Sequence, residues 1–451
     1  MACSRRGAVY GLDSQDGTIL WRLMVPGRAL ALHTVREGRA DSGAARAVLV
    51  FAHHRSGHFL LTFNPVTGTV VGEDAAPAPL EQALLLPELP ALDRTRPLLL
   101  VGRDGSAHLH PAAALPHLRH NAAQPKLFVV RQGGGGQLSG NLVQWQSSGP
   151  ALTPVWSLAA PGSRLVAVRA RQQDERVHSA GRVMADRSVL FKYMNPNLAL
   201  VVSEGEDGAS KTFMAVQMVD LVTGRVYYSA THKKVLPPFH AVHSENWAVY
   251  TFYNEKQRRT ELVSLEMYEG KEQSNATLFS SIDNSVVPLV ERQAYILPLT
   301  PQAIAETMTT KGITAKHLLV ASTGGAVLDL PLHMVDPRRP ALSTPAHLRE
   351  PGIPPYTPEL PLPPESILNY NQHVAGVRGL VSSPSGLEST VLVFVYGLDL
   401  YGTRLAPSKG FDLIKDDFEY LMITAVLAGL AAASYGTKKL AQRKMLNQAW
   451  K

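Results

Sequence analysis

The sequence GAVYGLDSQDGTILWRL, residues 7–23, contains the pattern from which the fold of this chain can be predicted. Apolar residues alternate along its first half, Asp16-Gly17 marks a turn, and a second short strand ends at Trp21. Two comparable units follow, HFLLTFNPVTGTVVG at 58–72 and TFMAVQMVDLVTGRVYYS at 212–229, each with an Asp or Asn four residues before a Gly. Because glycine readily adopts the positive φ that such a turn requires, each unit is predicted to be a β-hairpin.

Short apolar runs with the residue types of β-strands recur along the rest of the chain. We predict strands at 47–54, 98–102, 126–132, 164–170, 247–254, 261–268, 316–322 and 390–401. Many short strands separated by polar turns are typical of a propeller, a sandwich or a barrel. The hairpin units resemble the repeat of quinoprotein-like β-propellers, in which a turn glycine precedes a tryptophan that wedges between blades. We therefore expect residues 1–405 to be mostly β and to form a β-propeller, whose blade number and completeness the pattern leaves open.

Two segments of the predicted propeller region do not have a strand pattern. RQGGGGQ, residues 131–137, predicts a flexible surface loop, because it has no helix after it and does not satisfy the G-x-G-x-x-G spacing of a phosphate-binding loop. Residues 337–364 contain ten prolines, which exclude a regular strand or helix. This segment is predicted to be an extended connector that runs over a surface.

The sequence offers little that could carry out catalysis or hold a metal. It contains no G-x-x-x-x-G-K, H-E-x-x-H or G-x-S-x-G motif, and its single cysteine, Cys3, excludes an intramolecular disulfide and a cysteine-based zinc site. The spacing of His108, His110, His117 and His120 could suit a metal, but no carboxylate accompanies them and Ala and Pro lie between them. We therefore predict a loop there, and no catalytic residue, metal or cofactor in the chain.

The positive charge of the chain is concentrated at its C-terminus. The formal net charge is +7, and residues 437–451 carry five Lys or Arg and no acid. The body before them is therefore nearly neutral, which argues against a nucleic-acid-binding groove. We expect no nucleic-acid partner.

Residues 420–436 contain no charged side chain and are predicted to form a transmembrane helix. Seventeen residues make a helix of about 25 Å, at the short end of what crosses a hydrocarbon core of about 30 Å. A buried core helix at the end of a soluble domain is the alternative. Ala425, Gly429 and Ala433 share one helix face, where a partner helix could approach closely. The other interpretation is that these small residues merely dilute the hydrophobicity of the span.

Charges on the two sides of the span predict its orientation. The acidic segment is 406–419 and the basic tail is 437–451; the flanking charges are Asp416, Asp417 and Glu419 before the span, and Lys438, Lys439, Arg443 and Lys444 after it. Because Lys and Arg concentrate on cytoplasmic flanks, we predict a single-pass type I topology with a cytosolic tail and a lumenal body. Glu419 and Lys439 are expected either to lie at the two headgroup layers or to pair with polar groups of neighbouring subunits.

Two further observations bear on this topology. A sequon at Asn275 predicts glycosylation and agrees with a lumenal body. The rival topology is a tail-anchored protein with a cytosolic body, which the lack of an apolar run near Met1 would favour. The basic tail argues against it, because its cations would have to cross the membrane.

The C-terminal third, PSGLESTVLVFVYGLDLYGTRLAPSKGFDLIKDDFEYLMITAVLAGLAAASYGTKKLAQRKMLNQAWK at 384–451, resembles the family of subunit 1 of the endoplasmic reticulum membrane protein complex. Residues 191–202, 261–281, 312–331 and 336–340 are similar to that family as well. The resemblance implies a non-catalytic lumenal scaffold with one transmembrane helix, within a complex that inserts and stabilises transmembrane segments of clients. The implied partners are the other subunits, client membrane proteins and the lipid bilayer. Members carry a signal peptide and a large N-terminal part, so we expect an N-terminally shortened form.

Two other functions fit parts of the sequence. One is a single-pass lumenal or cell-surface receptor whose propeller binds a glycan or a protein. The other is a quinoprotein-like enzyme, which would need acids and cations beside a quinone, commonly with calcium and sometimes with a vicinal cysteine pair. The single cysteine excludes that pair, and no evident cluster of acids supports the rest.

Overall fold

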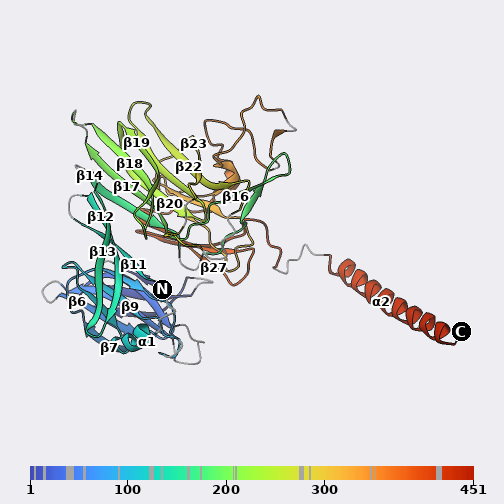
Figure 1. The fold of residues 1–451 in the computed structure, drawn as a ribbon, viewed down its shortest axis with the longest axis horizontal. Coiled ribbons are helices and arrows are strands. Elements are labelled where there is room, and N and C mark those ends of the chain that lie inside the picture. Colours follow the sequence, from blue (N-terminus) through green and yellow to red (C-terminus); the bar gives the residue numbers. More distant parts are fainter. Residues whose placement is uncertain are drawn as a thin grey trace.

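The computed structural model describes residues 1–4, 7–13, 17–36, 45–53, 57–89, 92–120, 126–133, 136–159, 163–172, 175–206, 208, 211–273, 279–283, 286–345, 348–350, 352–412 and 419–450. In these residues a mostly β body is followed by one long helix, which projects away from the body and ends beside the C-terminus (Figure 1). The mostly β prediction is confirmed.

The strands of the N-terminal half form four antiparallel sheets in the described part of the chain. They are, sheet by sheet, β1 (Ala2–Cys3), β2 (Ala8–Leu12) and β3 (Ile19–Met24); β4 (Arg28–Arg36), β5 (Arg46–His53), β6 (Gly57–Phe63) and β7 (Val70–Ala75); β8 (Leu80–Leu85), β9 (Leu98–Gly102) and β10 (Ala107–His110); and β11 (Phe128–Gln132), β12 (Gln137–Gln146) and β13 (Gly149–Ala159). The 3₁₀ helix η3 (Ala112–Ala114) and the helix α1 (Leu115–His120) follow β10.

Four more antiparallel sheets follow in the described residues of the C-terminal half. The first contains β14 (Ser163–Ala170), β17 (Leu198–Glu206), β18 (Thr212–Asp220) and β19 (Val226–Lys233). The second contains β15 (Gly181–Val183), β16 (Val189–Lys192), β20 (Val235–Ser244), β21 (Trp247–Asn254), β22 (Arg259–Gly270) and β23 (Leu289–Leu297). The last two contain β24 (Pro301–Glu306), β25 (His317–Ser322) and β26 (Val327–Pro331), then β27 (Gly379–Pro384), β28 (Val391–Tyr396) and β29 (Leu400–Leu405). Short 3₁₀ helices lie at η5 (Leu332–Met334) and η7 (Pro364–Ser366).

Each sheet packs face to face on the next one in the sequence. In β5, for example, Leu49 and Phe51 belong to the core shared with β1–β3, whereas Val48 and Val50 belong to the core shared with β8–β10. Successive side chains of a strand point to opposite faces, so an apolar run without polar alternation buries both faces of a sheet. Fully burying one such side chain contributes about 1.5–3 kcal/mol. Sheets stacked in chain order in this way are the blades of a propeller.

The predicted turns have the geometry that their sequences require. The N–H group of Gly68 donates to the carbonyl of Asn64, and that of Gly224 donates to the carbonyl of Asp220. The nitrogen–oxygen distance is 2.8 Å in both cases. Each glycine has φ of +73°, a conformation that costs other residues about 1–2 kcal/mol. The Asn64 Oδ1 also accepts from the N–H of Val66, 2.8 Å away, which closes the turn from within. The hairpin prediction is confirmed for these units.

Two tryptophans connect neighbouring sheets at these turns. The indole of Trp21, in β3, donates to the carbonyl of Pro65 in the turn between β6 and β7, with a separation of 3.2 Å. The indole of Trp156, in β13, donates in the same way to Leu221, 2.9 Å away, in the turn between β18 and β19. Each ring lies directly over the turn glycine, where an added Cβ would come within 2.7 Å of the indole. The wedging tryptophan expected from the repeat is thus a contact between successive sheets.

One strand prediction is wrong in its extent. The run 390–401 contains the end of one strand and the beginning of the next, because β28 ends at Tyr396 and β29 begins at Leu400. The chain reverses at Gly397, whose N–H donates to Asp399. The apolar residues continue across this turn, so the hydrophobic pattern alone did not reveal it.

The proline-rich connector is held firmly to the body. Its described residues contain no strand, as predicted, but Leu360 is buried against the sheet that contains β23. Arg339 donates hydrogen bonds of 2.8 Å to the carbonyl of Met334 and of 3.2 Å to the carbonyl of Pro354. Its guanidinium lies over the ring of Tyr295. The hydroxyl of Tyr356 donates to Ala294, 2.8 Å away. The connector therefore covers an apolar face.

Candidate functional site

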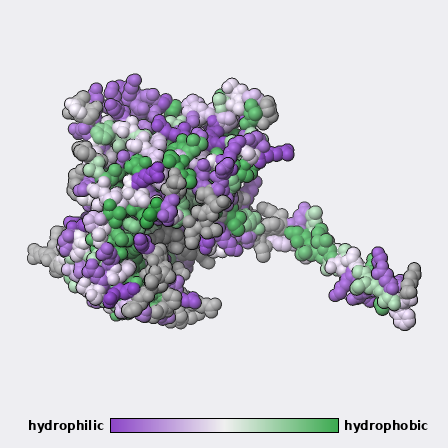
Figure 2. Space-filling view, viewed as in Figure 1, coloured by the Kyte–Doolittle hydropathy of each residue, from purple (hydrophilic) through white to green (hydrophobic). Residues whose placement is uncertain are grey.

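The C-terminal helix α2 (Tyr420–Ala449) is the one described helix that is long and apolar enough to cross a membrane. None of its side chains is buried. Apolar side chains gather in the half nearer the body and hydrophilic ones are frequent in the outer half (Figure 2). The helix does not end with the predicted span at Gly436 but continues through the basic tail, where no proline interrupts it.

The predicted packing residues all lie on the exposed first half of α2. Ala425, Gly429 and Ala433 are four residues apart and therefore on one face, and a Cβ at Gly429 would meet nothing within 4 Å. Backbones can approach closely at such a face. Whether a partner helix occupies it stays a prediction.

The predicted flanking charges lie mostly at the outer end of the helix. Glu419 is its N-cap residue and makes no side-chain capping bond. Of the basic residues, Lys439 has its ammonium 5.8 Å from the ring centre of Tyr435. Lys438, just before it, and Arg443 and Lys444, one turn further on, are exposed in the same half of the helix. Asp416, Asp417 and Asn275 lie outside the described residues, and the orientation in the membrane stays a prediction.

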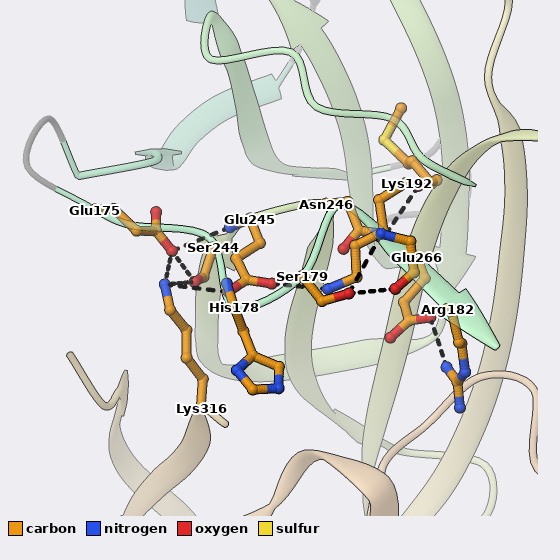
Figure 3. Close-up of polar contacts among 12 residues, drawn as sticks. Glu175, His178, Ser179, Arg182, Lys192, Ser244, Glu245, Asn246, Glu266 and Lys316 are labelled. Carbon is orange, nitrogen blue, oxygen red and sulfur yellow. Dashed lines mark hydrogen bonds and ion pairs between the residues drawn. The ribbon is translucent and has the colours of Figure 1, made fainter. Parts of the chain in front are cut away.

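The structure also assembles a buried polar cluster that the sequence pattern did not predict (Figure 3). The buried ammonium of Lys316 contacts the carboxylate of Glu175 and lies 2.9 Å from the hydroxyl of Ser244. The backbone N–H of Glu245 donates to Glu175 over 3.1 Å, and Lys192 pairs with the Glu245 carboxylate over 3.0 Å. The cluster therefore ties the segment after β14 to the turn between β20 and β21 and to the start of β25.

The energetics of this cluster favour a structural role. Burial lowers the pKa of the Lys316 ammonium to about 7, and the nearby Arg171 adds to the shift. Glu245 occupies the turn with φ of +46°, and its carboxylate also accepts from the N–H of His178, 2.8 Å away. Removing one partner of a buried pair costs about 3–5 kcal/mol, because the other charge is left without compensation. These groups hold the sheets in place, and each is already engaged.

A second ionic cluster anchors the connector. Arg182, in β15, contacts the carboxylate of Asp336 and lies 2.9 Å from Glu350 and 3.3 Å from Glu266. Burial, together with Asp336, raises the pKa of Glu266, while Arg182 opposes that shift. Arg338 contacts Glu350 from the other side. Residues far apart in the sequence meet here, so no local signal could have revealed the cluster.

The loop predicted for the histidine-rich segment is wrong, because the strand β10 and the helix α1 occupy most of it. His108 and His110 are in β10 and His117 is in α1; among the described residues, no group of three or more His, Cys, Asp or Glu is placed to hold a metal. The ring of His110 lies 3.9 Å from the Asp74 carboxylate, and burial lowers its pKa. The glycine run of 131–137 joins β11 to β12, with Gly133 donating to Gln137 over 2.8 Å.

Comparisons with known proteins give one consistent answer. A family model described as ER membrane protein complex subunit 1, second beta-propeller, matches residues 1–408. ER membrane protein complex subunit 1 of Gallus gallus is 41% identical over 461 residues, which cover 99% of this chain and 46% of that protein. The Xenopus laevis protein of the same name is 39% identical, with the same coverage. The chain thus spans about half the length of these relatives.

Similarity to solved structures is weak. The WD40 domain of SCAP from fission yeast is 10% identical with a TM-score of 0.30, and the match covers 72% of this chain and 65% of that one. The score is too low for this neighbour to add to the assignment.

Proposed function

Since the chain belongs to the family of ER membrane protein complex subunit 1, we propose that it is a non-catalytic, membrane-anchored scaffold of the ER membrane protein complex. In this role the β body lies in the lumen, α2 crosses the membrane of the endoplasmic reticulum, and the basic tail is cytosolic. The chain supports insertion and stabilisation of client transmembrane segments by holding other subunits in position. It contacts those subunits, clients and lipid, and no nucleic acid.

The observation that carries this proposal is an apolar helix with no buried side chain. A helix of this kind needs a nonpolar environment outside its own chain. The strong insertion residues, Leu421, Ile423, Val426, Leu427 and Leu430, contribute only roughly −2 to −3 kcal/mol together. Lipid alone therefore holds the helix weakly, and packing against other helices supplies additional stability.

The exposed small-residue face indicates where those helices pack. Small residues let two helix backbones come close, so that dispersion contacts replace contacts with lipid. At Gly429, where a Cβ would meet nothing from its own chain, a side chain added by substitution would enter the space of a neighbour. The opposite side of the helix has no such requirement.

Affinity purification in mild detergent, followed by mass spectrometry, tests the proposal. The tagged chain should recover the other subunits of the complex, and Gly429→Leu should reduce that recovery several-fold. Ala431→Leu is the matched control, because it adds a side chain on the opposite face and should leave recovery unchanged. A wild-type chain recovered as a free monomer would overturn the proposal and favour a receptor.

A further inference from the structure

A cavity of about 620 Å³ opens where four successive sheets meet. It is lined mainly by β14, β20, β24 and β27, which pack side by side, and three of them are labelled in Figure 1. Each of these strands is at one edge of its sheet, as the innermost strand of a propeller blade is. The volume is within the range of about 300–1,000 Å³ that is typical of small-molecule sites.

Three side chains with hydrogen-bond donors line this cavity, and the described part of the fold does not use those donors. The Arg378 guanidinium, the Gln302 amide and the Tyr396 hydroxyl all belong to its lining, and no side-chain hydrogen bond or ion pair engages any of them within the described chain. The Tyr396 ring lies directly against Gly379, where a Cβ would overlap the ring. A small number of polar groups in the lining of a pocket can fix the orientation of a ligand, and these three are available for that role.

The charges around the cavity select the sign of the ligand. Arg169 and Arg378 contribute two positive charges, whereas Glu306 is the one acid among the described residues of the lining. The Glu306 carboxylate already accepts a hydrogen bond from Gln172, 2.7 Å away. His240 is bonded to the Pro301 carbonyl over 3.1 Å, and burial lowers its pKa, so it adds no charge near neutral pH. The described residues of the lining thus carry one net positive charge, which matches a monoanion better than a dianion.

We propose that this cavity binds a carboxylate-bearing ligand, with the Arg378 guanidinium paired to the carboxylate and the Gln302 and Tyr396 side chains donating to its oxygens. A planar guanidinium matches a carboxylate in a two-point geometry. The carboxylate belongs either to a small free acid or to an acidic side chain of a polypeptide. The site is independent of membership in the complex, because all of its groups belong to this chain.

Calorimetric titration of the full chain in mild detergent at neutral pH tests the site. N-acetylglycine is the free-acid probe, acetyl-Gly-Asp-Gly-amide is the peptide probe, and N-acetylglycinamide is the neutral control. The site is supported if either acidic probe binds and the neutral control does not. The acidic probe that binds more tightly shows whether the carboxylate comes from a free acid or from a polypeptide. Absence of binding by both, or equal binding of the neutral amide, would overturn the proposed site.

Variants then locate the binding. Arg378→Gln should weaken the affinity at least tenfold, and Tyr396→Phe should weaken it several-fold while keeping the ring in place. Both residues are exposed, so neither change removes core packing. Arg404→Gln is the matched control, since Arg404 is exposed in β29 of the same sheet and does not line the cavity. Equal affinity of the Arg378→Gln and Arg404→Gln proteins would contradict the assignment.

Discussion

The contact between tryptophan and turn glycine makes a quantitative prediction for Gly224→Ala. Two penalties add at this position. The backbone has φ of +73°, which costs a residue with a Cβ about 1–2 kcal/mol. The new Cβ would also lie 2.7 Å from Cγ of Trp156, and overpacking of this kind costs about 1–3 kcal/mol. Gly224→Ala is therefore expected to lower the free energy of unfolding by about 2–5 kcal/mol.

The chain contains a matched control for the backbone penalty. Gly17 is in an equivalent turn with φ of +75°, but a Cβ there would meet nothing within 4 Å. Gly17→Ala should therefore show only the backbone cost of about 1–2 kcal/mol. Urea unfolding of the two variants, followed by tryptophan fluorescence, measures the difference. Equal midpoints would refute the conclusion that Trp156 packs tightly on the turn of the next sheet.

Three further predictions concern charge and protonation. Arg182→Met should lower the free energy of unfolding, measured in urea, by about 3–5 kcal/mol, because it leaves buried carboxylates unpaired. Arg164→Met, at an exposed ion pair, is the control and should cost at most about 1 kcal/mol. Similar losses in the two variants would contradict this prediction. Burial, with Arg171 adding to it, lowers the pKa of His243 to about 4, below its ordinary value of about 6.5. As the pH falls, His243 of the unfolded chain takes up a proton before His243 of the folded chain does, so the folded state loses stability between about pH 6.5 and 4. His243→Phe should reduce that loss of stability by up to about 3 kcal/mol. An unchanged dependence of stability on pH in this variant would contradict the prediction. Replacing Lys438 and Lys439 together by Glu should disturb either the orientation of α2 in the membrane or the assembly of the chain with other subunits. Glycosylation mapping measures the orientation and co-purification measures the assembly. Normal results in both assays would contradict a role of these lysines in orientation or assembly.

The part of the fold that the sequence predicted is the part that local chemistry determines. The pattern of Asn64 and Gly68 specifies a turn within five residues, and the charge-free run from 420 to 436 identifies the apolar half of α2. The turn and the apolar helix both depend on residues that are neighbours along the chain, so a single sequence was enough to predict them.

The interior contacts depend on pairs that are distant in the sequence. Lys316 meets Glu175 across 141 positions, and neither is in a local motif. The cavity likewise combines Arg169, in the first of the four described sheets in the C-terminal half, with Arg378, which directly precedes the first strand of the last one. A hydrophobic pattern predicts that strands stack, but it does not predict which polar residues meet between them.

Helix α2 is proposed to cross the membrane and to pack on neighbouring helices through the face of Ala425, Gly429 and Ala433. Cys3 is the only cysteine, so Cys3→Ser gives a background in which single cysteines can be placed at will. In native membranes, Gly429→Cys should form cross-links to another subunit of the complex, and Ala431→Cys, on the opposite face, should not. Cross-linking from Ala431→Cys alone, or from neither position, would contradict the claim.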